Sequence, residues 1–239
     1  MGNIPFLQLF SFGPDGWGGP MVKAAGMTLA VAFCGYLLGG VIGILGAWAK
    51  LQGGWFLRAI ADGYTTVLRG IPDLLVIFLF YFGAGAILTN FATFFGHDGF
   101  ITLPGFVAGF LAIGVVAGAY HTEVIRGAVL AVNRGELEAA TAVGMRPFVK
   151  FRRILAPLAL RSALPGLGNV WQLVLKEAAL VSVTGVVELV RQAQLGAGAT
   201  RDPFSFYLAA GALYLCITTV TGLAFQAAET YYGRGVRRP

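Results

Sequence analysis

Long uncharged runs constrain the fold of this chain more than any other feature. They cover residues 27–49, 74–96, 99–120 and 203–228, and a fifth segment at 163–187 is apolar apart from two charges. A helix needs about 20 apolar residues to cross the ~30 Å hydrocarbon core of a bilayer. Continuous apolarity without period-two alternation argues against a transmembrane β-barrel. The predicted fold class is therefore all-α, a polytopic membrane protein with five transmembrane helices.

Composition and the distribution of charge agree with that prediction. The mean hydropathy of +0.75 and a charged fraction of 12% exclude an ordinary soluble domain. Lys and Arg are enriched in cytoplasmic loops. If the amino end is periplasmic, twelve of the 17 basic residues lie in inner segments and three in outer ones. The formal charge of +6 is then a consequence of topology and does not require nucleic acid as a partner.

The only long polar segment covers residues 134–157. Residues 136–143 are good helix formers, Gly144 suits the end of that helix, and Pro147 suits the first turn of another. Phe148 and Phe151 fall on one face of the second helix, and Pro157 disfavours its simple continuation. The sequence therefore predicts two short helices with a bend between them, outside the bilayer.

This polar segment resembles the EAA loop of the membrane subunits of ABC importers. The signature positions match at the family spacing, and they are Glu138, Ala139, Ala140, Gly144, Ile154 and Pro157. Ala156 departs from the pattern, since the family often has Leu there. The resemblance implies a coupling helix that docks in a groove on a cytosolic ATPase, where small residues permit close approach. The alternative is a basic amphipathic segment that lies on anionic lipid.

Two further stretches resemble elements of polar-amino-acid permeases. The stretch around Arg69 and Asp73 resembles an Arg-Gly-x-Pro element, and the two charges, four residues apart, are predicted to pair on one helix face or to act at an inner gate. If the Gly-Pro bend spoils that geometry, they need other partners. The stretch that begins at Tyr120 resembles a Tyr-x-x-Glu-x-x-Arg-Gly-Ala element. Its Glu123 and Arg126, three apart, are expected to pair as an anchor at the membrane edge.

The fourth predicted span carries two charges. Lys176 lies about 20 Å into the bilayer core if the helix enters near residue 163, and a charge at that depth costs at least ~2.5–3.5 kcal/mol. Adjacent residues point about 100° apart, so Lys176 and Glu177 do not neutralise each other. Each is a functional candidate or half of a structural ion pair. The segment resembles a pathway-lining helix of amino-acid permeases, which makes Glu177 the candidate contact for a cationic group, with Gln172 and Ser182 as weaker candidates.

The family resemblance covers most of the chain. It implies a type I ABC importer permease of the polar amino acid family, similar to the Q-type subunit of histidine/lysine/arginine/ornithine or opine importers. One transmembrane domain over residues 1–239 would move an amino acid, cationic by the argument from Glu177, or an opine, by alternating access across a bacterial inner membrane. The implied partners are a second permease subunit, either a similar chain or a second copy of this one, two ATP-binding cassette subunits and a periplasmic solute-binding protein.

Several absences and one alternative complete the sequence-based prediction. The chain has no P-loop, so ATP and Mg²⁺ are expected in the partner subunits, and no metal site or catalytic residue is expected here. Outer-loop charges are predicted to form an exposed rim for the binding protein, and they are Glu188, Arg191, Arg201 and Asp202. The loop with His97 and Asp98 is expected to be solvated. The alternative function is an ion-coupled secondary transporter or channel that uses Lys176 and Glu177.

Overall fold

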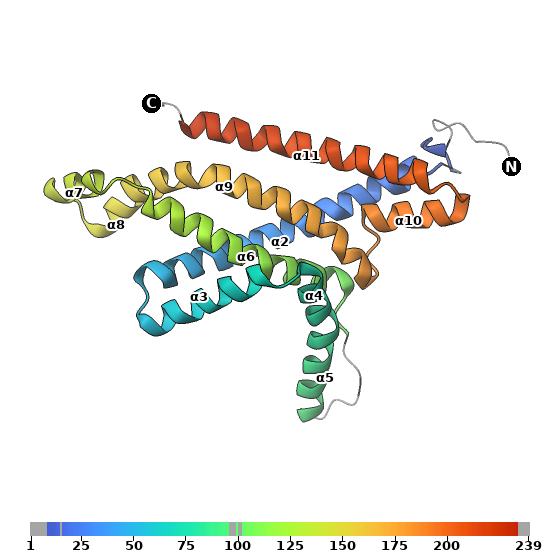
Figure 1. The fold of residues 1–239 in the computed structure, drawn as a ribbon, viewed down its shortest axis with the longest axis horizontal. Helices are drawn as coiled ribbons and strands as arrows, with labels where there is room; N and C mark the ends of the chain where they lie inside the picture. Colours follow the sequence, from blue (N-terminus) through green and yellow to red (C-terminus); the bar gives the residue numbers. More distant parts are fainter. Residues whose placement is uncertain (1–8, 15, 96–98, 100–101, 234–239) are drawn as a thin grey trace. The chain divides into compact units, whose positions relative to one another are not determined.

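The structure is a computed structural model that describes residues 9–14, 16–95, 99 and 102–233. His97, Asp98 and the basic tail from residue 234 lie outside these ranges. All elements of the described part are helical, as predicted (Figure 1). The α-helices are α2 (Gly18–Gln52), α3 (Trp55–Gly70), α4 (Asp73–Phe78), α5 (Ala84–Phe94), α6 (Gly105–Leu130), α7 (Arg134–Ala142), α8 (Pro147–Lys150), α9 (Ala156–Glu177), α10 (Leu189–Thr200) and α11 (Pro203–Gly233).

Four helical segments of the described residues are long and apolar enough to cross a membrane. They are Gly18–Gln52, Asp73–Phe91, Gly105–Leu130 and Pro203–Gly233, and they coincide with the four uncharged runs. The predicted fifth segment, 163–187, differs in its bounds. Its α-helix, α9, begins earlier and ends at Glu177, and a 3₁₀-helix (Ala178–Thr184) follows and ends at Gly185, whose φ is +84°. A left-handed residue favours glycine and stops the helix there.

The helices form two compact units, and α2, α6, α9 and α11 contribute residues to both. The first unit comprises Met1–Gly35, Pro72–Ile113 and Leu173–Val220. Its apolar core is centred on the fully buried Phe206, with the rings of Phe10 and Trp17 at 5.1 and 5.2 Å between centroids. Gly196 of α10 faces the Phe206 ring so closely that no side chain fits between them. The start of α11 therefore packs tightly against α10.

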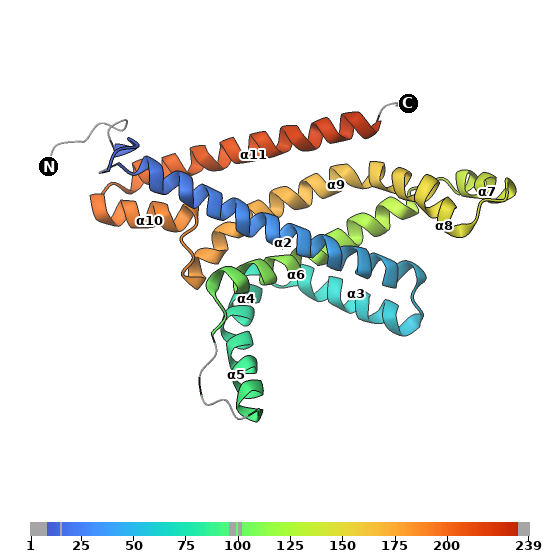
Figure 2. The ribbon, with the colours of Figure 1, turned by 180° about the vertical axis from the view of Figure 1, so that it is seen from behind.

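The second unit comprises Tyr36–Ile71, Gly114–Gln172 and Thr221–Pro239. Within it α3 folds back beside the end of α2, as both ribbon views show (Figures 1 and 2). The glycines of α2 face α6: a Cβ on Gly39 would lie 2.8 Å from the Ala117 side chain, and one on Gly43 would lie 2.3 Å from that of His121. These glycines therefore allow α2 and α6 to pack closely.

Gly43 provides a test of this packing. Gly43→Ala should push α2 from α6, because the new methyl group would also lie 3.0 Å from the His121 backbone. We expect a loss of about 1–3 kcal/mol, the usual cost of overpacking, seen as a fall of a few degrees in Tm in detergent. Gly40→Ala is the matched control, since nothing lies within 4 Å of its Cβ position. Equal Tm values for the two variants would contradict the close contact.

Candidate functional site

The EAA segment, residues 134–157, begins with a capped helix and a glycine turn. The Asn133 side chain accepts a hydrogen bond from the Gly135 N–H at 2.9 Å and caps α7. At the other end Gly144 has φ +77°. Its N–H donates to the Thr141 carbonyl at 2.9 Å, and the next N–H donates to the Ala140 carbonyl at 3.1 Å. This is the Schellman pattern, so the bend predicted at Gly144 is confirmed.

The second predicted helix starts where expected but does not stop. Pro147 occupies the first turn of α8, as predicted. However, α8 continues through a π-helical turn (Phe151–Leu155) directly into α9. Pro157 lies inside this continuous helix and has no N–H to donate to the preceding turn, which is the π-helical turn. The expectation of an isolated second short helix was therefore wrong, and α8 is continuous with the long helix α9.

The signature positions of the EAA segment lie on an accessible surface. Glu138, Ala139 and Gly144 are exposed, whereas Ala140 is buried. A cavity of about 590 Å³ opens beside them, and Ala139, Ala140, Ile154 and Pro157 all contribute to its lining. The neighbouring Val143 and Phe148 side chains are 74% and 71% exposed. Small residues, a shallow apolar cavity and exposed large apolar side chains are features of a protein-docking surface.

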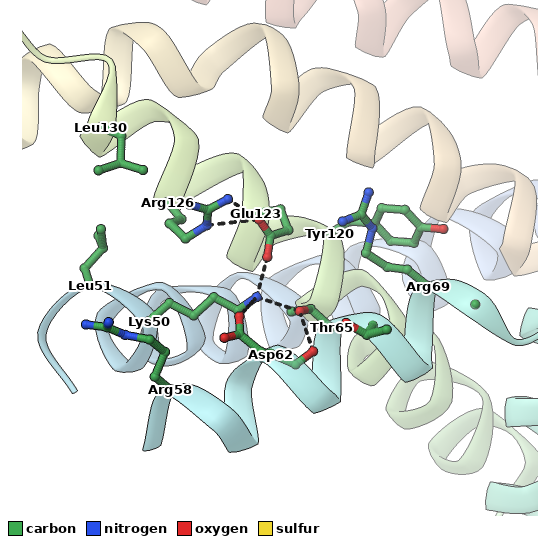
Figure 3. A pocket seen from close by; sticks show the side chains of 12 residues that line it. Lys50, Leu51, Arg58, Asp62, Thr65, Arg69, Tyr120, Glu123, Arg126 and Leu130 are labelled. Carbon is green, nitrogen blue, oxygen red and sulfur yellow. Dashed lines mark hydrogen bonds and ion pairs between the residues drawn. The ribbon is translucent and has the colours of Figure 1, made fainter. Parts of the chain in front are cut away.

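A cluster of charges joins three helices of the second unit (Figure 3). The Lys50 Nζ atom, at the end of α2, lies 2.7 Å from an Asp62 carboxylate oxygen of α3 and 2.5 Å from an oxygen of Glu123 of α6. It also donates to the Thr65 hydroxyl at 2.7 Å. The other Glu123 oxygen accepts two hydrogen bonds from Arg126, at 2.8 and 3.0 Å. The predicted Glu123–Arg126 pair is confirmed, as part of a larger network.

Sequence reasoning missed Lys50 and Asp62. The side chain of Lys50 is only 6% exposed, so its charge is stabilised mainly by the two carboxylates and the hydroxyl. A signal was present, because the polar residues of α3, Asp62 and Thr65 among them, interrupt its apolar residues. Nothing local in the sequence, however, connects Lys50 with a residue 73 positions away.

The predicted pairing of Arg69 with Asp73 on one helix face was wrong. Helix α3 ends at Gly70 and α4 begins at Asp73, with Ile71 and Pro72 extended between them. The i,i+4 geometry therefore does not exist. Arg69 instead places its guanidinium carbon 5.5 Å from the centre of the Tyr120 ring, in a cation–π contact.

Asp73 lies beside Glu177 in the first unit, where its charge acts on that carboxylate. Glu177 is 4% exposed, and no N–H or hydroxyl group of the described residues donates a hydrogen bond to its carboxylate oxygens; its polar neighbour is the Asp73 carboxyl group. Two ionised carboxylates repel each other unless a proton or a cation lies between them. This arrangement can accept a cationic group.

The other candidates of the fourth span differ in their surroundings. Lys176 is exposed, and neither it nor Glu177 forms an ion pair within the part of the chain that the structure describes. Ser182 is half-buried in the 3₁₀-helix. Gln172 is half-buried, and because it precedes Glu177 by five residues, the two point about 140° apart around the axis of α9. They therefore do not share one helix face.

The predicted rim of outer charges needs one correction. Arg191 and Arg201 are exposed, but Glu188 is fully buried and caps α10. Its carboxylate accepts hydrogen bonds from the Val190 N–H at 2.9 Å and the Arg191 N–H at 2.7 Å. Burial raises the pKa of the Glu188 carboxyl above its usual range, against the opposite effect of these two donors. Glu188 is thus a structural cap, unavailable for docking.

Comparison with known proteins places these features in a family. Residues 39–237 match the family described as "Binding-protein-dependent transport system inner membrane component". The chain belongs to this family. Among its curated relatives are ABC transporter permeases for opines and for amino acids.

Two curated relatives and one solved structure are similar over nearly the whole length. The octopine transport system permease protein OccQ of Rhizobium radiobacter is 60% identical, over 98% of this chain and 99% of that protein. The histidine/lysine/arginine/ornithine transport system permease protein HisQ of Salmonella typhimurium is 40% identical, over 93% and 97%. The crystal structure of an amino acid ABC transporter with histidines has a TM-score of 0.80 and 29% identity, covering 96% of this chain and 100% of that one.

The charge cluster predicts a specific loss of stability. Lys50→Gln would leave the carboxylates of Asp62 and Glu123 without their cation, and we expect a loss of about 1–3 kcal/mol. Thermal unfolding of the purified protein measures it. Arg58→Gln is the control, because Arg58 forms no ion pair among the described residues. A double variant with Glu123→Gln should lose less than the sum of the two single variants, and strict additivity would show that the contact contributes nothing.

Proposed function

We propose that this chain is a permease subunit of an ATP-driven importer that moves a cationic amino acid or an opine from periplasm to cytoplasm. The observation that carries the proposal is the EAA segment, whose glycine bend presents Glu138, Ala139 and Gly144 on an accessible surface. Because α8 continues into α9, a movement of this surface is transmitted directly to a membrane helix. Family membership supports the same role.

The proposed topology has five spans with the amino end periplasmic and the carboxyl end cytoplasmic. Four spans are the long apolar helices, and α9 with its 3₁₀ extension is the fifth. The excess of basic residues in the inner segments supports the orientation. It places the EAA segment in the cytoplasm, where an ATPase subunit can reach it.

The proposed complex contains a second permease subunit, two ATP-binding cassette subunits and a periplasmic binding protein. ATP and Mg²⁺ would be held by the cassette subunits, since this chain has no P-loop. Its own contribution is to couple their closure to the opening of a pathway, and net import requires substrate affinity to differ between the outward and inward states. The family match disfavours an ion-coupled transporter that works alone.

The proposed substrate contact is Glu177, supported by Asp73. A buried carboxylate without a donor, beside a second carboxylate, is stabilised by the arrival of an ammonium or guanidinium group. The named substrates of the relatives include octopine, histidine, lysine, arginine and ornithine, most of which carry such a group.

A change in the bend should uncouple the complex. Gly144→Val would force a β-branched residue into a left-handed conformation, which costs about 1–2 kcal/mol or more and displaces the docking surface. We expect ATP-driven uptake in proteoliposomes to fall at least about tenfold while ATPase activity persists. Gly63→Ala is the control, because this helical glycine has open space around it. Undiminished uptake in Gly144→Val, or transport by this chain without any copurifying ATPase, would contradict the proposed function.

Glu177→Gln tests the substrate contact. Removing the charge should reduce arginine uptake at least about tenfold, the usual effect of losing one charge-assisted hydrogen bond. Uptake of a neutral amino acid such as glutamine should change much less. Glu229→Gln removes an equal charge in α11 and serves as the control. Equal effects of Glu177→Gln on both substrates would eliminate the electrostatic argument.

A further inference from the structure

A cavity of about 900 Å³ in the second unit is lined by polar side chains of α3 and α6 (Figure 3). Four of its charged residues, Lys50, Asp62, Glu123 and Arg126, neutralise one another in the cluster described above. Two cations remain, Arg58 and Arg69. Neither forms an ion pair among the described residues. The cavity therefore carries a positive charge that the protein itself does not compensate.

Helix α3 carries its charged side chains on one face and large apolar side chains on the opposite face. Arg58, Asp62 and Arg69 follow one another at four and seven residues and share one face. The opposite face carries Phe56 and Ile60, which are 62% and 54% exposed. A helix at a membrane turns its apolar face toward lipid. The arginine face is then directed away from the hydrocarbon.

The cavity also extends far along a membrane-spanning helix. Tyr120, which lies under the Arg69 guanidinium, precedes the end of α6 at Leu130 by ten residues, or about 15 Å. Arg69 belongs to α3 and lies beside this part of α6, and a charge next to a spanning helix requires water, a counter-charge or a ligand. The side chain is exposed, so the cavity is accessible to small solutes.

Arg69 is suited to bind a planar oxyanion. Its guanidinium carbon lies over the Tyr120 ring, and the guanidinium forms no ion pair among the described residues. Two parallel N–H donors match the two oxygens of a carboxylate. Arg58 and Leu130 also line the cavity, and Figure 3 shows Arg58 apart from Arg69, toward the beginning of α3.

We propose that this cavity is an aqueous binding site for the carboxylate group of the transported amino acid or opine, with Arg69 as its principal ligand and Arg58 as a second, more peripheral cation. The site rests on the proposed function and adds to it a contact for the carboxylate group of the substrate. It requires every substrate to carry a free carboxylate.

The test is equilibrium binding to the purified nucleotide-free transporter complex, with radiolabelled arginine, octopine and argininamide, which lacks the carboxylate. Arg69→Gln should weaken binding of arginine and octopine at least tenfold and change argininamide binding less than twofold. Arg69→Lys keeps the charge but loses the paired donors, and should give an intermediate loss. Lys23→Gln removes an equal charge outside the cavity and should change none of the three.

Several results would overturn the site. One is that Arg69→Gln weakens the binding of argininamide as much as that of arginine. Another is that Arg69→Gln leaves arginine binding unchanged. A third is that the wild type binds none of the three compounds. If Arg69→Gln fails to fold, as judged by its Tm, Arg69→Lys decides alone. If the Arg69→Gln variant lost copurifying phosphatidylglycerol but still bound arginine, the cavity would be a site for a lipid headgroup and the proposal would be wrong.

The proposed function fails separately. Absence of ATP-driven uptake by the wild-type complex would refute the proposed function, whereas normal uptake with an unaffected Arg69→Gln variant would refute only the carboxylate site.

Discussion

Compensation of the Lys50 charge is the interaction on which the second unit depends. One ammonium group, almost completely withdrawn from solvent, joins the end of α2 to α3 and α6 through Asp62, Thr65 and Glu123. The glycines of α2 allow close approach to α6 but do not by themselves fix the sliding position of one helix along the other. A directional contact between charges does fix it, because a shift by one turn would leave a carboxylate and an ammonium group unpaired.

The same cluster determines which charges of α3 remain available. Asp62 pairs with Lys50, and no ion pair joins it to Arg58 on the same helix face among the described residues. Arg69 contacts the Tyr120 ring in a cation–π interaction and forms no ion pair among the described residues. Among the charges that line the cavity, those of the Lys50 cluster balance one another. The excess positive charge of the cavity therefore belongs to two arginines, Arg58 and Arg69. A site for an anionic group follows from this division more directly than from the number of basic residues in the chain.

Sequence reasoning succeeded where the physical cause is local. The bend at Gly144 and the start of α8 at Pro147 depend on residues within five positions, so spacing alone predicts them. It failed where the cause lies elsewhere in the fold. Lys50 finds Glu123 across 73 positions, and Glu188 was expected on the surface because the sequence does not reveal that its carboxylate caps a buried helix end. The Arg69–Asp73 pair failed because Pro72 divides the helix.

That division at Pro72 has a consequence for the substrate contact. It starts a new helix at Asp73, whose carboxylate is favoured by the partial positive charge of a helix amino terminus. Asp73 lies beside Glu177, and each carboxyl group disfavours a second negative charge at this place. A cation that lies between the two groups removes this penalty, because it interacts with both carboxylates at once. The free energy of binding a cation between two carboxylates is therefore more favourable than a single ion pair would provide. A conformational change that separates the two carboxylates would remove this advantage and release the substrate.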